Sequence, residues 1–195
     1  MDEAVIKAMG RWPNVPAVFG WLLLDRRGQW RLIQRDAPGF DPLQHARGEA
    51  ISSPAIIDFI ARNYDADSSG RWFWQNGPQR VFVNLDAAPL IFRVFESAKD
   101  HEKRLLVTHT GYPVERIDDV RIDPLGQVFL RSEHGPGMIH DMDLAQLRLE
   151  ALPDQDGQAL RWCWGNDPQG RQCLLIGPTA DAARHYGFER EPRER

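Results

Sequence analysis

Two short segments of the sequence combine an arginine with two closely spaced tryptophans. They are Arg71-Trp72-x-Trp74 and Arg161-Trp162-x-Trp164, and they hold four of the only seven tryptophans in the chain. An indole face beside a guanidinium can stack on a planar ligand, a sugar or a peptide and hydrogen-bond to it. The same indoles can instead pack into the core of a sheet. The sequence leaves both interpretations open.

The densest set of possible acid-base or metal-ligating groups lies further along the chain. Its members are Glu133, His134, His140, Asp141 and Asp143, and His109 stands at the end of an expected strand. Imidazoles and carboxylates serve as zinc ligands and as general acids or bases. Because their spacing matches no known metal signature, helix caps and solvated loop positions are the simpler explanation. A metal-assisted, hydrolase-like enzyme using His109, His134, His140 and Asp141 is therefore an alternative hypothesis.

No strong catalytic or cofactor motif accompanies these groups. The sequence contains no Gly-rich phosphate loop, no Gly-x-Ser-x-Gly elbow, no His-Glu-x-x-His and no paired Cys-x-x-Cys. We therefore predict no cofactor and no bound metal, and we leave open whether the protein is an enzyme.

Composition narrows the classes of partner. The 195 residues carry a formal net charge of −4, so the chain lacks the basic footprint that drives phosphate binding, and we expect no nucleic-acid partner. The longest apolar stretch, Val15 to Leu24, contains a proline and a glycine and is about half the length that crosses a bilayer. With no secretory signal at its start, the chain is expected to be cytoplasmic and without membrane contact.

Turn signals and hydrophobic periodicity divide the chain into alternating hairpins and helices. Helices are expected from Asp2 to Met9 and from Ser52 or Ser53 to Tyr64, and hairpins over 18–34 and 71–85. A charged connector over 96–104 is the best candidate boundary. The expected organisation is a first α+β repeat with its N-terminal helix over 1–95, a second over 105–188, and a frayed tail over 189–195.

An internal repeat supports this division. Residues 71–79 and 161–169 agree at six of nine positions, and similar turns, Asp25-x-x-Gly28-Gln29 and Asp123-x-x-Gly126-Gln127, precede the two copies. The sequence thus predicts an α+β fold in two similar halves, each hairpin-helix-hairpin, with antiparallel sheets packed by helices. Coincidence among common turn residues is the alternative. In the expected register Phe73 faces Phe82, and Cys163 faces Cys173, which suggests that the cysteines pack as small apolar groups.

Three segments also carry a resemblance to a known kind of family. They are Phe73 to Val81, Trp12-Pro13-Asn14-Val15-Pro16 and Gly20-Trp21-Leu22. Through them the chain resembles a family of small proteobacterial proteins of unknown function, from Trp12 through the second hairpin. The resemblance implies a bacterial cytosolic origin and supplies no catalytic residues.

Three functions of different classes follow. The leading hypothesis is a non-enzymatic ligand- or protein-binding accessory protein built by internal duplication, whose halves present a groove bearing Arg71, Trp72, Trp74, Arg161, Trp162 and Trp164. The alternatives are the hydrolase-like enzyme and a structural subunit of a homodimer. The partner, a small molecule or a protein, is not specified by the sequence.

Overall fold

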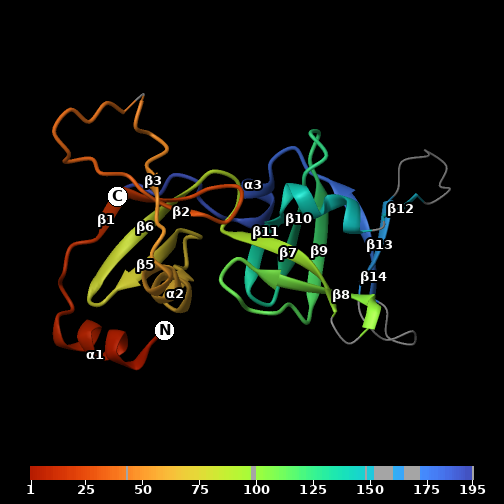
Figure 1. The fold of residues 1–195 in the computed structure, drawn as a ribbon, viewed down its shortest axis with the longest axis horizontal. Helices are drawn as coiled ribbons and strands as arrows, with labels where there is room; N and C mark the ends of the chain where they lie inside the picture. The colour runs from red at the N-terminus through yellow and green to blue at the C-terminus, as the bar shows by residue number, and fades with distance from the viewer. Residues whose placement is uncertain (43, 98–99, 148, 152–159, 165–171, 195) are drawn as a thin grey trace. The chain divides into compact units, whose positions relative to one another are not determined.

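The computed structural model describes residues 1–42, 44–97, 100–147, 149–151, 160–164 and 172–194. The chain forms two compact units: Met1–Ala88 together with the chain from Gly187 on, and Pro89–Tyr186 (Figure 1). Each unit is built on one sheet with few helices, which confirms the predicted α+β class. No helix in the described ranges is long and apolar enough to cross a membrane.

The first unit holds two helices and a six-stranded sheet in the order β3-β2-β1-β6-β5-β4. Neighbouring strands are antiparallel except β1 and β6, which run parallel. The elements are α1 (Glu3–Arg11), β1 (Val18–Leu24), β2 (Trp30–Leu32), β3 (Glu49–Ala50), α2 (Pro54–Arg62), β4 (Tyr64–Ala66), β5 (Trp72–Asn76) and β6 (Gln79–Leu85).

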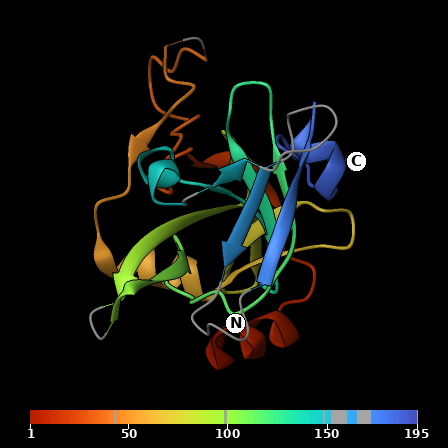
Figure 2. The same ribbon diagram turned by 90° about the vertical axis from the view of Figure 1, so that its right-hand side faces the viewer.

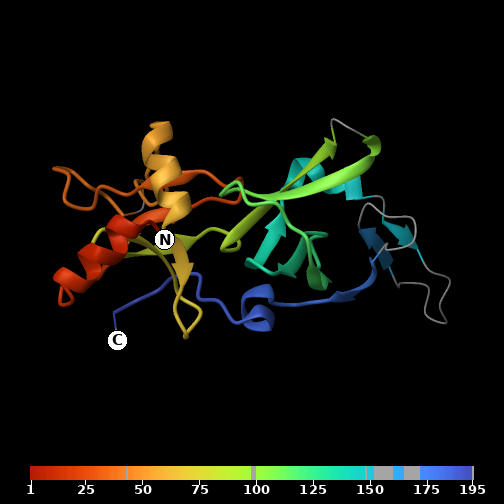
Figure 3. The same cartoon turned by 90° about the horizontal axis from the view of Figure 1, so that it is seen from below.

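Capping residues mark the start of α2, and hydrogen bonds join the start of α1 to the end of α2. Ser53 occupies the N-cap of α2 and Pro54 its first turn, where the missing N–H of proline costs no hydrogen bond. The start of α1 lies at the end of α2 (Figure 3). There the backbone N–H of Asp2 donates to Asn63 Oδ1 over 2.8 Å, and Arg62 pairs with the Asp2 carboxylate at 3.1 Å.

The chain returns to the first unit after Gly187. The backbone N–H of Glu189 donates to the carbonyl of Gly70, and that of Leu85 donates to the carbonyl of Arg190, each within 3.0 Å. Residues 189–194 therefore lie along the first unit, where the sequence suggests a frayed tail. Local composition misses this because the hydrogen bonds come from residues about a hundred positions away.

The second unit contains an eight-stranded sheet in the order β12-β13-β14-β9-β10-β11-β7-β8. Its elements are β7 (Leu90–Ser97), β8 (Asp100–Thr108), β9 (Ile117–Ile122), β10 (Val128–Ser132), β11 (Gly135–Ile139), the 3-10 helix η1 (Asp141–Leu147), β12 (Glu150–Ala151), β13 (Leu160–Trp164), β14 (Gln172–Pro178) and α3 (Ala182–Tyr186). Figure 2 shows β13 and β14 side by side in blue.

The boundary between the units differs from the one suggested by charge. The units divide between Ala88 and Pro89, so β7 belongs to the second unit. Of the charged segment 96–104, the described residues 96–97 and 100–104 belong to β7 and β8, whose register pairs Glu96 with Arg104. Charge alone does not distinguish a connector from paired strands, because charged residues occur in both.

Six strands of each unit follow the same order and directions. The order β3-β2-β1-β6-β5-β4 in the first unit matches the order β11-β10-β9-β14-β13-β12 in the second. In chain order, β1 to β6 thus correspond to β9 to β14. In each set the central pair, β1 with β6 and β9 with β14, is parallel. A helix, α2 or η1, follows the third strand in both.

Candidate ligand-binding site

Adjacent residues of β5 point to opposite faces of the first sheet. Successive side chains of a strand alternate, so Arg71 and Trp72 cannot share a face. The register pairs Phe73 with Phe82 and Gln75 with Arg80, as the sequence predicts. One face of this hairpin therefore carries Trp72 and Trp74, and the other carries arginines, phenylalanines and Gln75.

The tryptophan face packs against the rest of the unit. Trp72 is 7% exposed, and its ring centroid lies 4.9 Å from that of Tyr64. Trp74 is half-buried and meets Phe59 of α2 edge-on at 5.9 Å. These two indoles are packing residues, Trp72 against β4 and Trp74 against α2.

The opposite face is a cluster of stacked rings and guanidinium groups. Phe82 stacks on Phe19 of β1 with centroids 4.6 Å apart and planes inclined by 10°, and it meets Phe73 edge-on at 5.9 Å. The guanidinium carbon of Arg71 lies 4.6 Å from the Phe82 centroid, and that of Arg80 lies 3.9 Å from the Phe73 centroid. Each arginine is thereby oriented by an aromatic ring.

A pocket of about 520 Å³ opens on this face. That volume lies within the range of sites for small organic ligands. From the start of the chain it is lined by Met9, Trp12, Pro13, Val15, Ala17 and Phe19. The β5–β6 hairpin and the returning C-terminal segment add Arg71, Gln75, Pro78, Arg80, Phe82 and Glu194. Every lining residue belongs to the first unit.

The two arginines of this pocket differ in charge compensation. Arg71 forms an ion pair with Asp67, with Nη2 and Oδ2 2.8 Å apart. Burial alone would raise the pKa of Asp67, but hydrogen bonds from Arg71 and from backbone N–H groups outweigh it and hold that pKa below its ordinary value. Within the described residues, Arg80 has no carboxylate within ion-pair distance.

Gln75 places a buried amide at the same pocket. Its side chain is 2% exposed, and its Nε2 donates to the carbonyl of Gly77 over 3.0 Å. Its Oε1 accepts no hydrogen bond from any part of the chain that the structure describes. Most buried polar atoms have a partner, so this oxygen is an unusual feature of a residue that lines the pocket.

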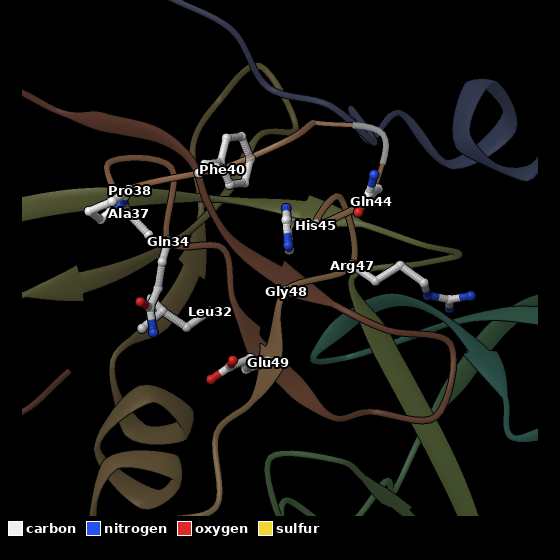
Figure 4. A pocket seen from close by; sticks show the side chains of 11 residues that line it. Leu32, Gln34, Ala37, Pro38, Phe40, Gln44, His45, Arg47, Gly48 and Glu49 are labelled. Atoms are coloured by element: carbon white, nitrogen blue, oxygen red, sulfur yellow. The ribbon is translucent and has the colours of Figure 1, made fainter.

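A second, smaller pocket of about 290 Å³ lies between β2 and the loop that leads to β3. Figure 4 shows His45 near the middle of this space, with Phe40 and Glu49 on either side of it. Its arginine, Arg47, is paired with Asp86 at 3.0 Å, and His45 Nδ1 is engaged by the backbone of Asp41. The larger pocket is the stronger candidate because, among the residues that the structure describes, its Arg80 has no ion-pair partner and its Gln75 holds a buried acceptor.

The second tryptophan segment is only partly described. Arg161 is half-buried, and Trp162 is 3% exposed on β13. The Cα register pairs Cys163 with Cys173 and Trp164 with Gln172, but the side chains of these four residues lie outside the described part. Trp162 is therefore a packing residue like Trp72.

His109 follows β8 in the second unit and is half-buried. The backbone N–H of Ile91 donates to its Nδ1 over 3.2 Å. Burial lowers its pKa to about 3, so the imidazole is neutral at physiological pH. A histidine enclosed in this way does not present an acid-base group to solvent.

The other members of the predicted cluster are held by local contacts. His134 Nε2 lies 2.8 Å from the carbonyl of Pro113, and His140 Nδ1 lies 3.0 Å from the Asp141 carboxylate. Asp143 is buried and pairs with Arg93 at 2.7 Å. Among the described residues, no three His, Cys, Asp or Glu side chains come close enough to hold a metal ion.

Sequence reasoning named Arg71 but missed its neighbours in the pocket. The alternation of side chains along a strand could have identified them. Gln75, Arg80 and Phe82 lie on the same face of the hairpin as Arg71, whereas the tryptophans lie on the other. The second signal was the family resemblance itself. The segments 12–16 and 73–81 that carry it both line the pocket, although 60 positions separate them.

Comparison with known proteins identifies a family without assigning an activity. A family model described as "Protein of unknown function (DUF2946)" matches residues 1–193, and no curated protein matches the chain. A DUF1285 family protein from Silicibacter pomeroyi DSS-3 is 16% identical, with a TM-score of 0.49 over 76% of this chain and 78% of that one. Another from Shewanella baltica OS155 is 17% identical, with a TM-score of 0.45 over 65% and 89%.

Proposed function

The chain belongs to the family described as "Protein of unknown function (DUF2946)", and we propose that it is a non-enzymatic binding protein that takes a small organic ligand in the larger pocket of its first unit. The observation that supports this proposal most directly is that Arg80, the buried amide of Gln75 and several aromatic side chains line one pocket. Pockets with apolar walls and a few convergent polar groups are typical of small-ligand sites.

The chemistry of the pocket favours binding over catalysis. Its titratable groups are Arg71, Arg80 and Glu194, and it contains no histidine, cysteine, serine or lysine. Arginine is always charged and is a poor proton-transfer group, and a single exposed glutamate has no oriented nucleophile beside it. Recognition therefore accounts for these residues better than acid-base or covalent chemistry does.

We also propose that the protein arose by internal duplication. The shared strand order, the two parallel central pairs and the repeated Arg-Trp-x-Trp segments support this origin. The positions that match Phe73 and Gln75 in the second segment are Cys163 and Gly165. The second copy thus lacks the ring and the amide, and the proposed binding role belongs to the first copy.

A thermal-shift screen against a library of small metabolites tests the binding role. A ligand that binds only the native state raises the midpoint of unfolding by mass action. We expect hits with the unmodified protein and with Ala37→Trp, which fills the smaller pocket, but not with Ala17→Trp, which fills the larger one.

The paired variants separate the outcomes. Hits that survive Ala17→Trp and disappear in Ala37→Trp would assign binding to the smaller pocket. A library that stabilises none of the three proteins would overturn the proposal of small-molecule binding.

A further inference from the structure

We infer that the ligand of the larger pocket is a planar, apolar ring system that carries one carboxylate and one hydroxyl or N–H donor. This inference rests on the proposed binding function and adds the class of ligand. Three independent features of the pocket each specify one part of that class.

The ring follows from the aromatic wall. Trp12 lines the pocket while 49% exposed, and Phe19 lines it half-buried. Arg11 covers the Trp12 ring with its guanidinium carbon 4.8 Å from the centroid. Flat side chains of this kind, flanked by Pro13 and Pro78, offer stacking surface to a planar ligand.

The single negative charge follows from the balance of charges at the pocket. Of the two arginines among the described residues that line the pocket, Arg71 is already neutralised by Asp67, so Arg80 is the one left to meet an anion. Glu194 also lines the pocket, and its carboxylate disfavours a doubly charged ligand. A carboxylate matches one guanidinium, whereas a phosphate monoester brings close to two negative charges.

The hydrogen-bond donor of the ligand is inferred from the side chain of Gln75. Gln75 lines the pocket, its Oε1 is buried without a donor from the described residues, and its Nε2 is held by the Gly77 carbonyl. A hydroxyl or N–H on the ligand supplies the missing hydrogen bond. A ligand without such a group leaves the oxygen unsatisfied and binds more weakly.

Calorimetric titration of the full chain with four related probes tests the class. The probes are hydroxynaphthoate, naphthoate, the neutral amide of hydroxynaphthoate, and adenosine monophosphate. We expect hydroxynaphthoate to bind most tightly. The amide should bind about tenfold more weakly or worse, because it lacks the charge that strengthens a hydrogen bond to arginine.

Variants connect each preference to its residue. Arg80→Gln should abolish the preference for the carboxylate over the amide, and Arg80→Lys should retain part of it. Gln75→Met should abolish the preference for hydroxynaphthoate over naphthoate. Glu194→Gln should tighten binding of the carboxylate. Arg47→Gln, in the smaller pocket, is the matched control and should change none of these ratios.

The outcomes distinguish the class from the function on which it rests. If the amide or adenosine monophosphate binds more tightly than hydroxynaphthoate, and Ala17→Trp abolishes that binding, the class is wrong and the binding function stands. If the carboxylate preference persists in both Arg80 variants, the class is also wrong. If no probe binds and the metabolite library yields no hit, both proposals fail.

Discussion

The Phe19 ring lies parallel to the Phe82 ring, with centroids 4.6 Å apart. Phe19 belongs to β1 and Phe82 to β6, the parallel pair at the centre of the first sheet. This contact joins the part of the pocket that the N-terminal segment lines to the part that the β5–β6 hairpin lines. The stability of the unit and the shape of the pocket therefore depend on the same ring.

Phe82→Ala should reduce the free energy of unfolding by about 3 kcal/mol or more, because it deletes a buried aromatic ring. Phe82 is 3% exposed and contacts Phe19, Phe73 and Arg71. Denaturant unfolding measures the change. Leu125→Ala, at a side chain that is 84% exposed, is the control and should stay within about 0.5 kcal/mol of the unmodified protein. An equal loss in both variants would contradict the packing role of Phe82.

Gly70→Ala should lower the free energy of unfolding more than Gly126→Ala does, although both glycines occupy the same kind of turn. Each N–H donates to the carbonyl of an aspartate three residues earlier over 3.0 Å, and φ is 80° at Gly126 and 76° at Gly70. A Cβ at Gly126 meets nothing, so the left-handed backbone alone should cost about 1–2 kcal/mol.

At Gly70 an added Cβ overlaps the carbonyl of Gly187, where the chain returns to the first unit. The overlap should add about 1–3 kcal/mol to the cost of the turn. Unfolding free energies of the two variants provide the comparison. Equal losses would show that the returning segment does not pack on Gly70.

The Asp67–Arg71 pair should make stability depend on acidic pH. Because the folded state holds the pKa of Asp67 below its ordinary value of 3.8, its stabilising contribution is present above that pH. The contribution is lost as pH falls through the lower, folded value. Asp67→Asn should therefore cost about 1–2 kcal/mol at pH 7, and less near pH 3. A cost that is the same at both pH values would argue against the ion pair.

His109 should make the folded state less stable as the pH falls. Its pKa falls from an ordinary value of 6.5 in the unfolded chain to about 3 in the folded chain, so between these values the unfolded chain binds a proton that the folded chain does not. Stability should fall as pH decreases from about 6.5 towards 3. His109→Gln should flatten this part of the profile. In an NMR titration the imidazole should stay neutral down to about pH 4, and a midpoint near 6.5 would refute its burial.

The sequence by itself determined the hairpin registers, the α+β class and the family. Alternation and turn residues place Phe73 opposite Phe82 because strand pairing is a local consequence of a short turn. The repeated segments also predicted two similar halves, and that origin by duplication stays a proposal.

Only the tertiary structure decided which side of the Arg71 hairpin forms a pocket. The helix α2 covers the tryptophan face through Phe59, whereas residues 12–19 and the returning C-terminal segment border the other face. These partners are distant in sequence, and both faces of the hairpin carry aromatic rings, so local pattern could not rank them. For the same reason the sequence left open whether Trp72 and Trp74 contact a ligand or pack in the core, while long-range packing left Arg80 and Gln75 at the pocket.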